Sequence, residues 1–152
     1  MVKRLVIFDS LYGNTQKVAE AIGETVGAKV VSVKETNPDT LKDFELLVFG
    51  SPTHGGQAKP EAGSFLKRIP ADGLKGLRVA AFDTRADVSD QGFFLKTLMR
   101  TIGFAAPKIA KTLAGKGGEL VGEPTGFIVE GKEGPLRKGE INRAEEWANG
   151  LV

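Results

Sequence analysis

The sequence predicts an α/β protein whose mostly parallel β-sheet is covered by helices on both faces. Short apolar runs rich in β-branched and aromatic residues alternate with longer segments whose apolar residues recur at the helical period. Such strands and crossover helices build parallel sheets with two buried faces. No repeat, linker or low-complexity segment interrupts this order, so residues 1–152 are expected to form one domain.

The first half of the chain is predicted to hold three strands and three helical segments. The strands are expected at residues 3–9, 30–33 and 46–49. A helix over 14–26 presents Val18, Ala21, Ile22 and Val26 on one face, and Gly27 ends it. A short helical turn fits 39–44, and a further helix starts near Pro60, with an apolar stripe made of Ala62, Phe65, Leu66 and Ile69.

The second half is predicted to add two strands and three helices. The fourth strand covers 77–82, and the fifth runs from Leu120 to Val129 with a bend over 122–126. The crossover from Ser89 to Gly118 holds two helical pieces. The first is expected to bury Phe94, Leu95, Leu98, Met99 and Ile102, and the second, from Pro107, to bury Ile109, Ala110 and Leu113. A closing helix carries Ile141, Ala144, Trp147, Ala148 and Leu151 on one side.

Composition excludes several classes of site. The absence of cysteine excludes disulfides, thiolate metal sites and cysteine nucleophiles, and the single His54 excludes a multi-histidine metal site. The net charge of +2 is spread without a basic block, which favours a solvated surface over nucleic-acid binding. No apolar run approaches the length of a membrane span, and Met1-Val2-Lys3-Arg4 leads into a strand rather than a signal peptide, so a cytoplasmic protein is expected.

The first candidate loop, Ser10-Leu11-Tyr12-Gly13-Asn14-Thr15, joins a buried strand to a helix. Gly13 permits a tight turn, Asn14 or Thr15 can cap the helix, and neighbouring N–H groups can point at a phosphate. The loop has neither a G-x-G-x-x-G fingerprint nor the lysine of a P-loop. Tyr12 could contact a ligand or cover the loop. A plain capped turn would need only one such residue, so we interpret the set as a phosphate site.

The second candidate loop, Gly50 to Gly56, follows the third strand. Pro52 stiffens it, and Gly55-Gly56 can adopt positive φ or flip a peptide. Its N–H and C=O groups could face the edge of a planar heterocycle. His54 could lie against the face of that ring or simply be exposed.

The third candidate loop follows the fourth strand and carries Asp83, Thr84 and Arg85. Arg85 could stabilise negative charge on a ligand, or could form a surface pair with Asp87 or Asp90. Asp9 and Asp83, at two strand ends, could meet above the sheet; the favoured interpretation is that they accept hydrogen bonds from loop N–H groups. Ligands of parallel sheets bind at this carboxyl edge, so the three loops are expected to form one site.

With these loops placed, the chain resembles the flavodoxin family over essentially its whole length. Residues 10–15 resemble that family's phosphate loop, T/S-x-T-G-x-T, with Tyr12 in place of a threonine, and Gly50-Ser51-Pro52-Thr53 resembles its second flavin loop. The resemblance implies a three-layer αβα sandwich, a five-stranded parallel sheet of order 2-1-3-4-5 and noncovalent FMN. The implied cofactor-binding residues are Ser10, Leu11, Tyr12, Gly13, Asn14, Thr15, Pro52, Thr53, His54, Gly55, Gly56, Asp83, Thr84 and Arg85.

Two features differ from the family pattern: the ring-binding loops offer only His54 where aromatic residues usually stack on the flavin, and the chain is slightly basic rather than acidic. The leading hypothesis is electron transfer to a redox partner protein or a small quinone-like acceptor. The alternatives are a flavin-dependent quinone reductase or protoporphyrinogen-oxidase-like enzyme, and a flavin-free binding module.

Overall fold

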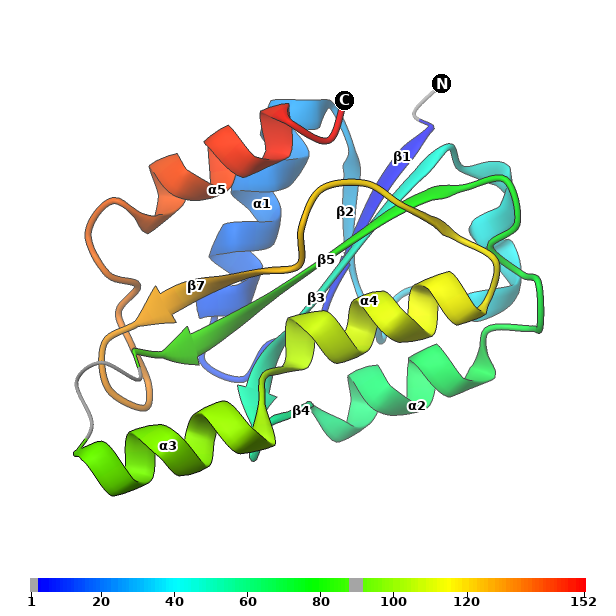
Figure 1. The fold of residues 1–152 in the computed structure, drawn as a ribbon. Helices are drawn as coiled ribbons and strands as arrows, with labels where there is room; N and C mark the ends of the chain where they lie inside the picture. Colours follow the sequence, from blue (N-terminus) through cyan, green and yellow to red (C-terminus); the bar gives the residue numbers. More distant parts are fainter. Residues whose placement is uncertain (1–2, 88–91) are drawn as a thin grey trace.

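The computed structural model describes residues 3–87 and 92–152, and shows a central β-sheet between two layers of helices (Figure 1). Within these residues the sheet has seven strands: β1 Arg4–Phe8, β2 Lys29–Ser32, β3 Leu46–His54, β4 Gln57–Ala58, β5 Arg78–Ala86, β6 Glu119–Leu120 and β7 Thr125–Val129. The helices are α1 Asn14–Val26, the 3₁₀ helix η1 Pro38–Asp43, α2 Pro60–Arg68, α3 Phe93–Ile102, α4 Ala105–Gly115 and α5 Glu140–Asn149.

The predicted αβα sandwich and strand order are confirmed, with a difference in the strand count. The parallel order is β2-β1-β3-β5, and β6 and β7 both pair with β5 at the next position. These two short strands are the predicted bent fifth strand, interrupted over residues 121–124. The seventh strand, β4, pairs antiparallel with the end of β3.

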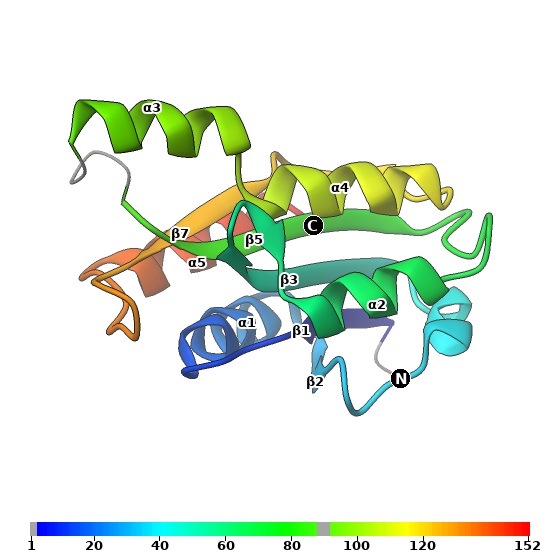
Figure 2. The same ribbon diagram turned by 90° about the horizontal axis from the view of Figure 1, so that it is seen from below.

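Alternation of side chains along the strands divides the core into two halves. Leu47 and Phe49 face the α2–α4 side, whereas Leu46 and Val48 face the α1–α5 side. Because both faces are covered, the middle strands have continuous apolar stretches, such as Leu5–Phe8 in β1 and Leu46–Phe49 in β3. Figure 2, turned from the first view, shows α1 and α4 on opposite sides of the sheet.

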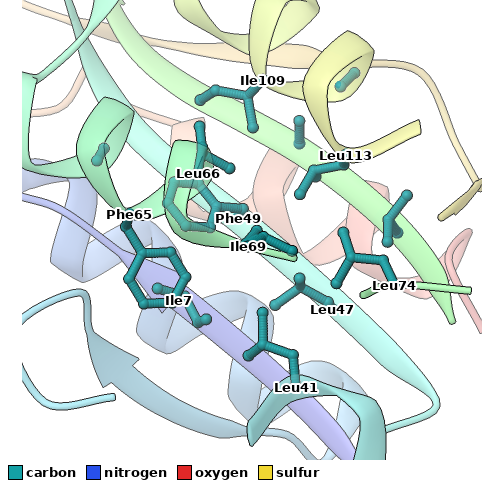
Figure 3. Close-up of a cluster of buried hydrophobic side chains, with 14 of the residues drawn as sticks. Ile7, Leu41, Leu47, Phe49, Phe65, Leu66, Ile69, Leu74, Ile109 and Leu113 are labelled. Atoms are coloured by element: carbon teal, nitrogen blue, oxygen red, sulfur yellow. The ribbon is translucent and has the colours of Figure 1, made fainter. Parts of the chain in front are cut away.

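Close packing on the α2–α4 side links the helices to the sheet. Ile7, Leu47 and Phe49 from the strands lie against Phe65 and other apolar side chains from α2, α4 and η1 (Figure 3). The Phe49 and Phe65 ring centroids are 5.7 Å apart. The predicted stripe of α2 is therefore its buried face.

On the other side, Phe82, Phe127 and Trp147 pack edge to face, with centroids 6.1–6.2 Å apart. Ala144, Ala148 and Leu151 are buried there as predicted, whereas Ile141 is 37% exposed. No helix in the described part of the chain has the length and apolar character to cross a membrane.

The prediction for the first crossover helix is wrong in part. Phe94 and Leu98, expected in the core, are 82% and 44% exposed, and Phe93 is 87% exposed. α3 extends past the N-terminal end of α4, away from the sheet (Figures 1 and 2), so in the described part of the chain no layer covers Phe94 and Leu98. Ser89, Asp90 and the side chains of Leu95, Met99 and Ile102 lie outside the described residues.

Candidate functional site

A cavity of about 370 Å³ opens at the carboxyl edge of the sheet, where parallel α/β proteins bind ligands. Its volume falls within the roughly 300–1,000 Å³ of small-molecule sites. The sequence-predicted residues that line it are Leu11, Tyr12, Asn14, Thr15, Pro52, His54, Gly55, Thr84 and Arg85. The structure thus brings all three candidate loops to one cavity. Ser10, Gly13, Thr53, Gly56 and Asp83 do not line it.

The start of α1 leaves backbone donors free at the edge of this cavity. Gly13 is the N-cap, with φ of 91° in the left-handed region, and makes no side-chain capping bond. The first-turn N–H groups of a helix have no intrahelical acceptor. Ser10 Oγ accepts the Gly13 N–H at 3.0 Å and supports the turn. An uncapped helix start of this kind favours an anion.

The expected cap by Asn14 or Thr15 is wrong, because both side chains bind elsewhere. Asn14 Nδ2 donates to the Glu133 carbonyl at 2.8 Å. The Thr15 hydroxyl shares a buried hydrogen bond of 2.8 Å with the Thr84 hydroxyl. These bonds tie the first loop to the end of β5 and to the segment after β7, so only backbone N–H groups remain at the start of the helix.

The second candidate loop is largely a β-hairpin rather than a loop. β3 continues to His54, which pairs with Gln57 of β4, and Gly55 and Gly56 form the two-residue turn. Both glycines have positive φ, 56° and 79°, as a type I′ hairpin turn requires. The hairpin is anchored from α4: Thr53 Oγ1 accepts the Ala105 N–H at 3.0 Å, and the Gly56 carbonyl accepts from Lys108 Nζ at 2.6 Å.

The third candidate loop is also strand, because β5 continues to Ala86. Arg85 donates from Nε and Nη2 to the two carboxylate oxygens of Asp83, each at 2.7 Å. Its guanidinium lies 3.8 Å from the Phe104 ring centroid. Arg85 therefore pairs with Asp83 rather than with Asp87, one of the two alternative partners; the other, Asp90, lies outside the described residues. Asp83 is fully buried and neutralises the arginine charge.

Asp9 and Asp83 each accept a hydrogen bond from a backbone N–H group, but the donors lie at the start of a helix rather than in the loops that the favoured interpretation expected. Asp9 Oδ2 accepts the Ala62 N–H of α2 at 3.1 Å, and Asp83 Oδ2 accepts the Ala106 N–H of α4 at 2.8 Å. Carboxylates at these positions complement the positive helix ends.

A buried ammonium group lies beside Asp9. Lys59 Nζ is 2.9 Å from Glu61 and 3.5 Å from Asp9. Its hydrogen bond to Glu61 raises the pKa of Lys59 above the usual value; burial lowers it, and the charge of Asp9 raises it again. The group remains a cation that joins α2 to the end of β1.

A fourth segment at the cavity, residues 130–137 after β7, was not predicted from the sequence. Ala86, Val129, Gly131 and Lys132 complete the cavity lining. The Arg137–Asp87 and Asn14–Glu133 hydrogen bonds hold this segment against the other sides of the cavity, and the Arg137–Glu130 bond lies within the segment. Gly131 and Lys132 come directly after the predicted fifth strand. Because the carboxyl ends of all the parallel strands lie at this edge, their position could have predicted that they reach the cavity.

Comparison with known proteins identifies the architecture. A family profile described as a flavodoxin domain matches residues 5–117, which is most of the chain. The chain belongs to the flavodoxin family. Its flavodoxin fold is also seen in oxidised flavodoxin 2 from Bacillus cereus, with a TM-score of 0.76, 21% identity and coverage of 99% of this chain and 97% of that one.

Three further proteins extend the comparison. A flavodoxin from the domain Archaea superposes with a TM-score of 0.74 at 19% identity, covering 99% of this chain and 96% of that one. An uncharacterized protein of Methanocaldococcus jannaschii is 27% identical over 166 residues, covering 99% of both chains. The fold also occurs within a larger protein, rubredoxin oxygen:oxidoreductase from Desulfovibrio gigas, with a TM-score of 0.73, 20% identity and coverage of 99% of this chain but 35% of that one.

In this flavodoxin-family chain, few aromatic side chains line the cavity. Tyr12, 43% exposed, and His54, also exposed, are the aromatic side chains among the described lining residues. Phe93 and Phe94 lie on α3, outside the cavity lining. The cavity therefore offers a well-supported turn at the α1 end and an open edge at the hairpin end.

Proposed function

We propose that this flavodoxin-family protein binds FMN noncovalently in the cavity at the carboxyl edge and transfers electrons through it. The supporting observation is that an uncapped helix start, with Gly13 in the left-handed region, and a two-glycine hairpin turn meet at one cavity. The flavin would supply the redox chemistry, accepting and donating one or two electrons. The chain would bind it, orient it and set its electrostatic surroundings.

The α1 end fits a phosphate group. Gly13, supported by Ser10, turns the chain so that the uncapped first-turn N–H groups of Asn14, Thr15 and Gln16 can donate to an anion. No charged side chain is needed for this, because aligned backbone dipoles favour negative charge at a helix start. The buried Thr15–Thr84 bond keeps the turn and the end of β5 together.

The hairpin end fits one edge of a planar ring. Pro52 and Gly55 line the cavity, and the peptide groups at Gly55 and Gly56 lie in a turn without side chains. A carbonyl oxygen here could accept a hydrogen bond from a ring N–H, and glycine lowers the cost of flipping that peptide. Tyr12 and His54 would cover only part of the ring.

Electrostatics at the cavity differ from the sequence expectation. Arg85 is neutralised by Asp83, so it would contribute little net charge toward a flavin. Lys132 brings the other formal charge among the described lining residues, and it is exposed. We therefore assign the stabilisation of an anionic cofactor chiefly to the α1 backbone, with a contribution from the exposed Lys132.

The test is a titration of the flavin-free protein with FMN and with riboflavin, which lacks the phosphate, followed by flavin fluorescence and absorbance. We expect FMN to bind at least about a hundredfold more tightly, equivalent to roughly 2.7 kcal/mol. Ser10→Ala should weaken FMN binding and leave riboflavin binding unchanged, whereas Ser64→Ala on α2 is the matched control. Equal affinities would contradict a phosphate site at α1, and a protein that binds neither would be a flavin-free binding module.

The exposed hairpin end favours a second candidate, a flavin-dependent quinone reductase. Because Tyr12 and His54 are the only aromatic side chains in the described lining, a small acceptor would have room beside the flavin. Saturable, rapid oxidation of the reduced FMN-loaded protein by a soluble quinone would support this enzyme. Slow oxidation that rises linearly with quinone concentration would favour the electron carrier.

A further inference from the structure

The two helix layers carry opposite charge. Within their bounds, α2, α3 and α4 contain six basic residues and one acidic residue, whereas α1 and α5 contain two basic and five acidic residues. Figures 1 and 2 show α2 and α4 on one side of the sheet and α1 and α5 on the other. A net charge of +2 for the whole chain therefore conceals a strong separation across the sheet.

The basic character is densest around α3 and α4. From Gln91 to Gly118 the sequence has five basic residues and no acidic residue: Lys96, Arg100, Lys108, Lys111 and Lys116. Lys111 is exposed on the outer face of α4. Asp90 and Glu119 flank this stretch, but every charge within it is positive, which is suited to an anionic partner.

The same region exposes large apolar side chains. Phe93 and Phe94 are 87% and 82% exposed, and with Thr97 and Leu98 they line a small hollow of about 230 Å³. Two adjacent, almost fully exposed phenylalanines are unusual on a protein surface and indicate a contact. They stand at the start of α3, which extends away from the sheet (Figures 1 and 2).

We propose that the α3–α4 face docks on an anionic membrane surface, with Phe93 and Phe94 entering the headgroup region. Aromatic side chains on a projecting helix end can enter lipid without a shaped partner surface, while surrounding lysines and arginines attract anionic headgroups. The combination supplies the apolar and the electrostatic signals that stable peripheral binding needs. The docking does not depend on bound flavin.

Docking in this orientation would leave the cavity near the membrane. Phe104, at the start of α4, stacks on Arg85 of the cavity lining. If the proposed flavin site is correct, a membrane-dissolved acceptor would approach from this side. Binding to vesicles would stand even if the flavin proposal failed.

The experiment is flotation of the purified full-length protein with vesicles of phosphatidylcholine alone and of equal parts phosphatidylcholine and phosphatidylglycerol. We expect binding to the anionic vesicles, little binding to the neutral ones, and loss of binding as salt is raised. The double variant Phe93→Ser, Phe94→Ser should weaken binding at least about tenfold, and Lys111→Glu should weaken it as well.

Matched controls come from the acidic layer. Ile141→Ser removes an exposed apolar side chain from α5, and Lys17→Glu removes an exposed basic side chain from α1. Both variants should bind the vesicles like the wild type. Thermal unfolding checks that every variant is folded. Failure of the wild type to bind anionic vesicles, or equal loss in the control variants, would overturn the proposal. So would a wild-type dimer that the double phenylalanine variant converts to a monomer, since the patch would then join two copies.

Discussion

At the scale of single residues, Glu140 shows how one buried carboxylate holds two elements together. Its Oε2 accepts the Ile128 N–H of β7 at 2.6 Å, and its two oxygens accept from Arg143 at 2.9 and 2.7 Å. Arg143 in turn lies over the Phe127 ring at 4.7 Å. Burial raises the pKa of Glu140, but the hydrogen bonds from Arg143 and Ile128 lower it, and the result lies below the ordinary value of 4.5.

Because the folded-state pKa of Glu140 is lowered, its contribution to stability is present above the unfolded pKa and is lost as pH falls through the folded value. Glu140→Gln should lower the free energy of unfolding at pH 7 by about 1–3 kcal/mol. The difference in unfolding free energy between the variant and the wild type should narrow as the pH is lowered below 4.5, the ordinary value for the group. Urea unfolding across this range measures both effects, and the exposed Glu145→Gln is the control. A difference in unfolding free energy that does not change with pH would contradict a lowered pKa of Glu140 in the folded state.

At the scale of elements, the hairpin of β3 and β4 decides what the second candidate loop can do. Gly55 and Gly56 occupy left-handed positions, and a Cβ on Gly55 would meet nothing within 4 Å. The cost of a side chain at Gly55 is therefore one of backbone conformation alone. That makes this turn suitable for separating stability effects from contact with a ligand.

Gly55→Ala should lower the free energy of unfolding by about 1–2 kcal/mol, and Gly55→Asn by less, because asparagine tolerates left-handed φ. If the turn peptides contact the proposed flavin, Gly55→Ala and Gly56→Ala should shift its reduction potentials. Spectroelectrochemical titration of the FMN-loaded variants measures the shift. The peptide-flip hypothesis fails if each alanine variant leaves both potentials unchanged.

At the scale of the whole molecule, stability is concentrated in the middle of the sheet. β3 pairs with β1 on one side and β5 on the other, and its Leu46 to Phe49 are fully buried. The start of α3 lies at the other extreme, with two phenylalanines more than 80% exposed. Local opening should follow this gradient of burial.

Native-state hydrogen exchange should therefore report the global free energy of unfolding, about 5–15 kcal/mol, for amides of Leu47 to Phe49. Amides at Phe93 and Phe94 should exchange with little protection, because they begin a helix with few buried contacts. Hydrogen exchange measured by NMR, compared with urea unfolding of the same sample, tests both the β3 amides and those at the start of α3. Equal protection of β3 and the start of α3 would contradict this gradient.

Much of the fold could be predicted because its signals are local. The period of Val18, Ile22 and Val26 indicated the buried face of α1, and Gly27 ended that helix as expected. Periodicity wrongly predicted that Phe94 and Leu98 are buried, because it shows that a helix face is apolar but not that another layer covers it. It also ended the third and fourth strands too early, because turn residues such as Pro52 and Asp83 continue the strands through pairing with their neighbours.

By itself, the sequence determined the order of strands and helices, the two-sided burial of the sheet and the edge where the candidate loops gather. These follow from patterns within short segments of chain. Only the tertiary structure decided that Arg85 is neutralised by Asp83, that Asn14 binds the segment after β7, and that Lys132 reaches the cavity. Such pairings depend on which distant side chains the fold brings within hydrogen-bond distance, and no local pattern records that.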